Sequence, residues 1–306
     1  VIDNILGSSI GKAEELSKKY ITLVEEIRIR FGLIDISAGT SVNKFLYSPV
    51  NELRKGLFYP LFDLLRSNTD AEIFYQQATD ETLRSFNHLY TSGYKKWASL
   101  SIMKAFNPNQ LLGIHMSELD MYTFHKSGGN VERVPNPTTI DRIHFHDFNE
   151  SAALTVPDFI LYSSNHNIYL SISPDVTQPM TFISGSYPDR EWLPASTYGL
   201  LSPRHTMIYI DENPNNLSLI SDLYKTCRPD LLLDFHTEEK PSLEDCLDNI
   251  KSCHNQVKPT IGTFIITDTI QNEHFCNNLG DGINLLPVGL DESKLAPLID
   301  SIIKSK

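Results

Sequence analysis

The chain of 306 residues lacks several features that define common classes of protein. It has four cysteines, and no two of them have the CxxC spacing of a zinc knuckle. Scattered thiols in a chain of this length are typical of a reduced cytoplasmic protein rather than a disulfide scaffold. No apolar run approaches the roughly 18 residues that a membrane span needs. We therefore expect a cytoplasmic protein that has no membrane partner.

Two kinds of catalytic loop and a strongly basic surface are also missing. The sequence contains no Gly-rich phosphate loop. It also contains no Gly-x-Ser-x-Gly elbow, the motif that would indicate a serine hydrolase. The net charge of −12 argues against a broadly basic surface that coats nucleic acid. Residues 1–150 carry 16 Lys and Arg against 18 Asp and Glu, whereas residues 151–306 carry 10 against 20. Any contact with nucleic acid is therefore expected in the first half.

The first 125 residues are predicted to be mostly helical. Apolar residues at helical spacing predict an amphipathic helix over residues 8–32. A second helix is expected over residues 51–66, where Pro60 must kink or split it. After a helix start at Asp70, a longer helix is expected over residues 80–106, with Gly93 as a candidate break. Asn107 and Pro108 end it.

Beyond residue 129 the pattern predicts short strands and then an alternation of strands and helices. The later elements are strands 205–210, 230–235, 260–267 and 283–288, and helices 215–226, 242–253 and 295–304. Such alternation implies a parallel or mixed sheet covered by helices. We expect an α/β protein in three parts: a helical N-terminal region (1–80), a helix plus β-hairpin core (81–202) and an α/β C-terminal region (203–306), with a mixed sheet and flanking helices.

Residues 156–175 predict an antiparallel hairpin, since two β-branched and aromatic runs are joined by turn-forming residues. Pro157 and Asp158 open the first strand, and a Tyr94-Lys-Lys-Trp97 segment lies on the preceding long helix. Together these features resemble the PD-(D/E)xK nuclease core, and in particular McrC-like restriction subunits. The resemblance implies that Asp158 is the first carboxylate of a divalent-metal site.

The resemblance also implies that this metal site is degenerate. The acid and the lysine of the return strand should fall near Ser171 and Ser173, and serine neither binds metal well nor acts as a base. The helix glutamate that is common in such nucleases is absent, because Lys95 and Lys96 stand between Tyr94 and Trp97. Asp158 is then vestigial, and we expect no cofactor and no enzymatic activity.

A subunit of this kind is expected to act as a scaffold or to position nucleic acid within a larger assembly. The McrC-like resemblance implies protein partner subunits, among them a motor-type NTPase, in defence against foreign DNA. DNA or RNA would be contacted by lysines of the long helix, namely Lys95, Lys96 and Lys104.

A zinc-dependent hydrolase is the first alternative. His115 and Glu118 form an His-x-x-Glu pair, and Asp234-Phe235-His236-Thr237 follows much later in the chain. This pattern resembles zinc carboxypeptidases and related deacylases, which implies that His115, Glu118 and His236 hold zinc and leave one position open. The sequence shows neither a convincing Asn-Arg substrate clamp nor a late glutamate that could act as general base.

A receiver-like protein is the second alternative. Asp211 and Glu212 follow an apolar strand and resemble the acidic opening of response-regulator receivers, where paired acids bind magnesium. The phosphorylated aspartate would then be Asp230 or Asp234. A purely structural interaction protein remains as a further alternative.

Overall fold

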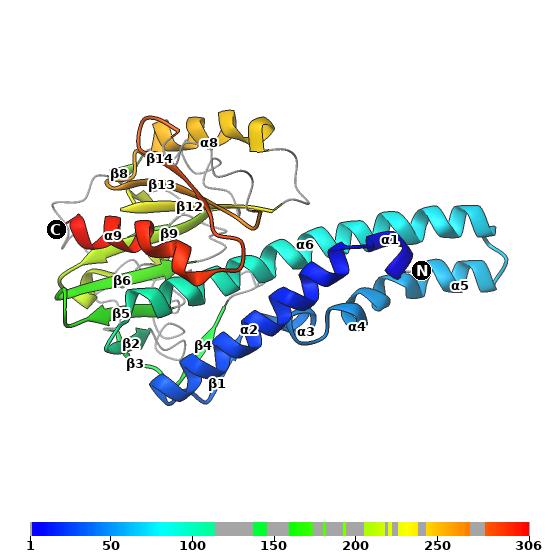
Figure 1. The fold of residues 1–306 in the computed structure, drawn as a ribbon, viewed down its shortest axis with the longest axis horizontal. Coiled ribbons are helices and arrows are strands. Elements are labelled where there is room, and N and C mark those ends of the chain that lie inside the picture. Colours follow the sequence, from blue (N-terminus) through cyan, green and yellow to red (C-terminus); the bar gives the residue numbers. More distant parts are fainter. Residues whose placement is uncertain are drawn as a thin grey trace, which may run out of the picture.

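In the computed structural model, a long helical arm projects from one side of a layered α/β body (Figure 1). The structure describes residues 2–113, 137–145, 159–173, 180–181, 192–193, 205–217, 220–221, 226–237, 243–269 and 279–305.

The N-terminal region is helical, as expected. Its elements are α1 (Ile2–Leu6), α2 (Ser9–Phe31), α3 (Thr40–Tyr47), α4 (Pro49–Arg54), the 3₁₀ turn η1 (Lys55–Leu57) and α5 (Phe58–Leu65). The prediction of a helix over residues 8–32 is confirmed by α2, which ends at Gly32 in the left-handed region. The predicted second helix is split into α4, η1 and α5. Pro60 has no N–H to donate to the carbonyl of Gly56, so the helical ladder is interrupted at this turn.

The two helix starts predicted at Asp70 and Asp80 belong to one unbroken helix, α6 (Ala71–Phe106). The Asp70 carboxylate caps it by accepting hydrogen bonds from the N–H groups of Glu72 and Ile73, at 3.0 and 2.9 Å. The prediction of a break at Gly93 is wrong. A Cβ atom on Gly93 would lie only 2.9 Å from Cδ2 of Leu46, so glycine there permits close packing against α3. Asn107, at φ 54°, ends the helix as predicted.

Eight strands of the described residues form one mixed sheet, which confirms the α/β class. Its order is β14-β13-β12-β9-β6-β5-β2-β3. The strands are β2 (Gln110–Gly113), β3 (Thr138–Thr139), β5 (Phe159–Ser163), β6 (Ile168–Ser173), β9 (His205–Asp211), β12 (Leu231–His236), β13 (Gly262–Thr267) and β14 (Ile283–Pro287). The predicted hairpin is present: β5 and β6 pair antiparallel, with Phe159 opposite Ile172.

The direction of the sheet changes at β12. From β2 to β12 each neighbouring pair is antiparallel, whereas β12, β13 and β14 are parallel, and α8 (Leu243–Val257) lies between β12 and β13 in the chain. The helix predicted over residues 215–226 is not what the described residues show. They form the 3₁₀ turn η3 (Pro214–Leu217) and two short strands, β10 (Ile220–Ser221) and β11 (Thr226–Cys227). A parallel neighbour needs a long crossover, usually a helix, and β9 and β12 are antiparallel.

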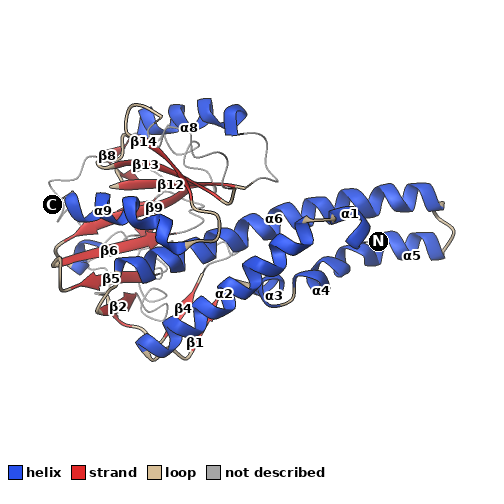
Figure 2. Cartoon of the chain, in the orientation of Figure 1, coloured by secondary structure: helices blue, strands red, loops and turns tan. Residues whose placement is uncertain are grey.

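Helices cover both faces of the sheet (Figure 2). On one face, Leu233 and Phe235 of β12 join a continuous core with α2, α6 and α9 (Ala296–Lys304). On the other face, Leu232 packs with Cys253 and Val257 of α8. Since successive residues of a strand point to opposite faces, Asp234 and His236 share the α8 face with Leu232.

The three predicted regions are continuous in space. The boundary expected at residue 80 falls inside α6, and β6 pairs with β9, so strands of the second and third regions belong to one sheet. Smaller two-stranded pairings join β1 (Asp35–Ser37) to β4 (Arg142–His144), β7 (Met180–Thr181) to β10, and β8 (Trp192–Leu193) to β11. Within the described part of the chain, no helix combines the length and the apolar character needed to cross a membrane.

Candidate functional site

The β5–β6 hairpin is the place where the nuclease resemblance predicts a site. Asp158 lies outside the described residues, directly before β5. Ser171 is buried and pairs with Ile160, and Ser173 pairs with Met207 of β9. The described residues of these two strands, Phe159–Ser163 and Ile168–Ser173, include no acidic or basic residue. The hairpin itself therefore supplies neither a second carboxylate nor a lysine.

The lysines predicted to contact nucleic acid do not form an exposed basic surface. Lys95 and Lys96 are only 5% and 1% exposed. Nζ of Lys96 lies 5.5 Å from the ring centroid of Phe145, within the range of a cation–π contact. Nζ of Lys104 is bound between Glu26 of α2 at 2.5 Å and Glu292 at 2.9 Å. These hydrogen bonds, that of Glu26 first, raise the pKa of Lys104. The structure places all three lysines in internal contacts.

The Tyr-Lys-Lys-Trp segment anchors α6 to the sheet. Tyr94 stacks on Trp97, with ring centroids 5.5 Å apart, and meets the edge of Phe235 on β12. The Tyr94 hydroxyl lies 2.9 Å from the carbonyl oxygens of both Thr267 and Gly289. Burial raises the pKa of Tyr94 well above its ordinary value. The motif thus contributes to the core on the α6 face of the sheet.

Of the predicted zinc ligands, His115 and Glu118 lie outside the described residues. His236 ends β12 and is buried. Among the described residues, no group of three His, Cys, Asp or Glu side chains is arranged to hold a metal ion. The described part of the chain therefore offers one of the three predicted ligands and no complete site.

A buried polar cluster lies between β9 and β12, and the sequence reasoning missed its first member, His205. His205 pairs with Asp234 across the two strands, and its Nε2 lies 3.5 Å from Oδ2 of Asp234. His236 is two residues further along the same face of β12. Burial, and secondarily the charge of Asp234, raises the pKa of the Cys253 thiol to about 12. This thiol is protonated at neutral pH and is a poor nucleophile. Two features of the sequence could have indicated the cluster: a histidine at the start of one predicted strand, and an Asp-x-His pair at the end of another.

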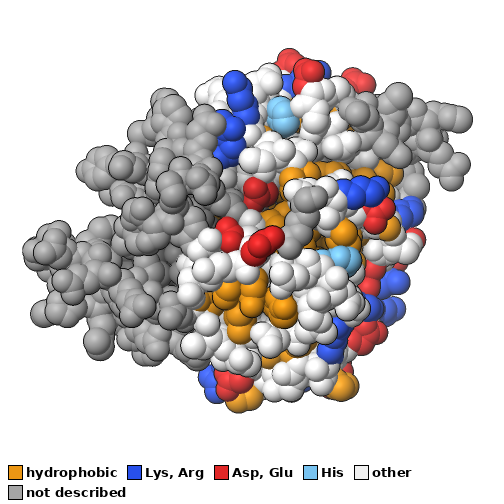
Figure 3. Space-filling view, turned by 90° about the vertical axis from the view of Figure 1, so that its left-hand side faces the viewer, with side chains coloured by type: hydrophobic (Ala, Val, Ile, Leu, Met, Phe, Trp, Pro, Cys, Tyr) orange, Lys and Arg blue, Asp and Glu red, His pale blue; other side chains and the backbone are white. Residues whose placement is uncertain are grey.

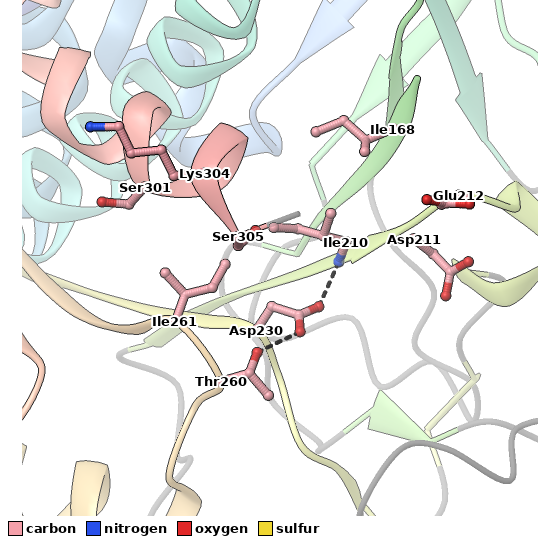
Figure 4. A pocket seen from close by; sticks show the side chains of 10 residues that line it. All are labelled: Ile168, Ile210, Asp211, Glu212, Asp230, Thr260, Ile261, Ser301, Lys304 and Ser305. Carbon is pink, nitrogen blue, oxygen red and sulfur yellow. Dashed lines mark hydrogen bonds between the residues drawn. The ribbon is translucent and has the colours of Figure 1, made fainter. Parts of the chain in front are cut away.

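An open pocket of about 530 Å³ lies at the other end of these strands (Figure 4). Its acidic lining comes from Asp211 and Glu212 at the end of β9 and from Asp230 just before β12. The Asp230 carboxylate accepts a hydrogen bond from the N–H of Ile210 at 2.7 Å and one from the hydroxyl of Thr260 at 2.6 Å. These bonds fix the start of β12 beside β9 and β13.

The pocket brings together Asp211, Glu212 and Asp230, one of the two candidate phosphorylation sites of the receiver alternative, but in another topology. Asp211 ends β9 and Asp230 precedes β12, and they lie at the same end of these two strands because the strands are antiparallel. Asp234 lies on β12 toward the opposite end. Lys304 of α9 also lines the pocket, and its side chain points away from the acids (Figure 4). Figure 3 views the end of the molecule opposite the arm tip, and acidic side chains gather near the middle of this face.

Comparison of the chain with protein-family models, with curated proteins and with solved structures finds no match. A function for this chain is therefore proposed from its residues and their geometry.

Proposed function

We propose that the chain is a non-catalytic subunit with a PD-(D/E)xK-like sheet that serves as a scaffold for partner proteins. The observation that carries this proposal is the β5–β6 hairpin. Its two strands pair antiparallel, and their described residues are apolar, aromatic or serine. Metal-dependent cleavage of a phosphodiester needs carboxylates that converge on the ion and a group that activates water. Asp158 alone cannot supply both.

A scaffold is better supported than a subunit that positions nucleic acid. The three predicted lysines are buried or bound to glutamates, and the whole chain carries a net charge of −12. Binding to nucleic acid depends largely on exposed cations that neutralise phosphates. By family analogy alone, the partner would be a motor-type NTPase of a defence assembly.

The first experiment tests for residual catalysis. Purified protein is incubated with DNA or RNA and with Mg²⁺ or Mn²⁺, beside an Asp158→Ala variant. We expect no metal-dependent cleavage by either protein. Cleavage by the wild type that Asp158→Ala abolishes would contradict the proposal.

The second experiment tests the scaffold role in the cell. Because no reaction depends on Asp158, the Asp158→Ala variant should co-purify with the same proteins and support the same cellular activity as the wild type. Loss of that activity with the protein partners retained would indicate a catalytic subunit.

Two binding measurements separate the alternatives. Fluorescence anisotropy with labelled DNA and RNA should show no binding at physiological salt. Binding that weakens steeply with added salt would favour the positioning of nucleic acid. Metal analysis should find no stoichiometric zinc, whereas about one zinc per chain, lost in His236→Ala, would favour the hydrolase alternative.

A further inference from the structure

Helix α5, near the end of the arm, is apolar on two sides. Leu64 of α5 and Leu57 of the preceding turn η1 are half-buried, and Leu57 packs against the main core. A second stripe, made of Phe58, Leu61, Phe62 and Leu65, is exposed. Its spacing of i, i+3, i+4 and i+7 is the pattern of a helix face that packs against another helix. No residue of α5 is buried, although an apolar helix of this kind normally is.

The exposed stripe is large enough for a specific interface. We define the arm-tip patch as Phe58, Tyr59, Leu61, Phe62 and Leu65. Tyr59 is 84% exposed and Leu65 is 71% exposed. Since a fully exposed aromatic side chain presents about 150–250 Å², the patch exposes on the order of 500 Å². Two such patches would bury about 1,000 Å², the size at which specific interfaces begin.

The charges around the patch argue for a protein and against a lipid surface. Residues 48–85 include 4 Lys and Arg and 6 Asp and Glu. Helices that lie on membranes are rich in Lys and Arg on their polar side, which favours contact with anionic lipids. The arm lacks this excess of positive charge. Its aromatic content is instead typical of the buried centre of a protein interface.

The same charges favour a second copy of the chain in antiparallel orientation. An antiparallel α5 pair centred on Leu61 and Phe62 brings residue 54 of one copy near residue 70 of the other. Arg54 is exposed just before the patch in the chain, and Asp70 and Glu72 are exposed just after it, at the end of the arm. A two-fold axis makes this contact twice, since an isologous interface uses the same surface on both copies. A parallel pair would place Arg54 beside Arg54 and Glu72 beside Glu72.

From these observations we infer that the arm-tip patch is a homodimerisation surface, on which α5 and α6 of two copies form an antiparallel four-helix bundle. Two helical hairpins that each expose an apolar stripe bury both stripes in this way. The surface lies on the arm, remote from the β5–β6 hairpin (Figure 1). It is therefore independent of the proposed loss of catalysis.

Sedimentation equilibrium of the full chain at micromolar concentrations measures the association. The wild type should be a dimer. A double variant, Tyr59→Asp with Leu65→Asp, should weaken the dimer by about 100-fold or more, because it places carboxylates on both sides of the apolar centre, within the buried patch. Both side chains are largely exposed in the single chain, so the fold should persist, which circular dichroism verifies.

Ile29→Asp is the matched control, because Ile29 is 74% exposed on α2 and lies outside the patch. It should leave the dimer unchanged. A monomeric wild type, or a dimer that the double variant does not weaken, would overturn the inference. Flotation of a monomeric wild type with phosphatidylserine vesicles, abolished by the double variant, would also overturn it and indicate a lipid surface.

A charge exchange tests the antiparallel arrangement. Arg54→Glu should weaken the dimer about tenfold, and adding Glu72→Arg should restore it, since the pair would then be reversed across the interface. Failure of the second change to restore association would contradict the antiparallel bundle.

Discussion

The two halves of α6 have the same helical backbone but opposite surroundings. From Tyr90 to Phe106 almost every residue is buried, including Lys95 and Lys96, because the sheet and α2 lie alongside. In the arm half, Ile73, Tyr75 and Leu83 are exposed. The comparison shows that tertiary contacts, not residue type or helix propensity, decide which side chains of a helix stabilise the fold. Substitutions of buried residues in the core half should therefore be costly, and substitutions of the exposed residues in the arm half should not.

The largest effect is expected at Trp97, which is fully buried. Trp97→Ala should lower the free energy of unfolding by about 3–5 kcal/mol, through lost burial and the cavity left behind. Tyr75→Ala in the arm half should cost about 0.5 kcal/mol or less. Urea denaturation at fixed protein concentration measures both. Trp97→Phe should cost less than Trp97→Ala, since the indole N–H has no hydrogen-bond partner among the described residues. Equal losses of stability in Trp97→Ala and Tyr75→Ala would refute the claim that tertiary contacts decide which side chains of α6 stabilise the fold.

Removing the Tyr94 hydroxyl should have the next largest effect. Tyr94→Phe should cost about 1–2 kcal/mol, because the hydroxyl no longer bonds to the buried carbonyls of Thr267 and Gly289. The pKa of Tyr94 is raised by burial, so the unfolded chain loses this proton first as pH rises. Its contribution is complete below about pH 10 and is lost as pH rises toward the raised pKa. The free energies of unfolding of wild type and Tyr94→Phe, measured against pH, should therefore converge above about pH 10. Curves that stay parallel would contradict the conclusion that burial raises the pKa of Tyr94.

Two glycine substitutions compare a closely packed helical position with an open one. Gly93→Ala should destabilise the protein by about 1 kcal/mol, because the new Cβ would crowd Leu46 by more than alanine gains in helix propensity. Gly11→Ala in α2 should stabilise by about 0.5–1 kcal/mol, since nothing lies within 4 Å of its Cβ position. Thermal unfolding should give opposite signs. Stabilisation by both substitutions would show that the contact with Leu46 relaxes freely.

The smallest effect is expected at Lys104, near the C-terminal end of α6. Its side chain is 38% exposed, so solvent screens its ion pairs with Glu26 and Glu292. Lys104→Met should cost no more than about 1 kcal/mol, and less at high salt. A double-mutant cycle with Glu26→Gln measures the coupling. A cost that is large and independent of salt would contradict this expectation, because it would mean that solvent does not screen the contacts of the ammonium group with Glu26 and Glu292.

Local signals were sufficient to predict most elements, and they failed where longer-range contacts decide. The apolar spacing of α2 and the strands around Asp230 and Ile283 were predictable. Thr79 and Asp80 look like a helix start. Within α6, however, the Thr79 hydroxyl donates to the carbonyl of Tyr75 at 2.8 Å, which lets the helix continue. The segment after Asp211 was predicted as a helix. The side chains of Asp211 and Asn213 instead accept backbone N–H bonds that hold a tight turn.

The site residues were harder to predict, because burial and strand direction are not local properties. Lysines are rarely buried, so their type predicts Lys95 and Lys96 at the surface, but Phe145, just after β4 and far along the sequence, lies against Lys96. His205 and Asp234 meet only because β9 and β12 are antiparallel. The sequence predicts a helix between these two strands, and the parallel pairing that such a helix implies would place His205 and Asp234 at different ends of the sheet.

The unbroken course of α6 sets a spacing between the sheet and the arm tip. At about 1.5 Å per residue, its 36 residues span about 54 Å, with no hinge to absorb a change. One inserted residue in its exposed half would turn the tip by about 100° relative to the body, whereas seven would lengthen the reach by about 10 Å and nearly keep its orientation. The length of α6 therefore determines the distance between the sheet and a partner bound at the arm tip. Its helical rotation determines the direction in which that partner faces.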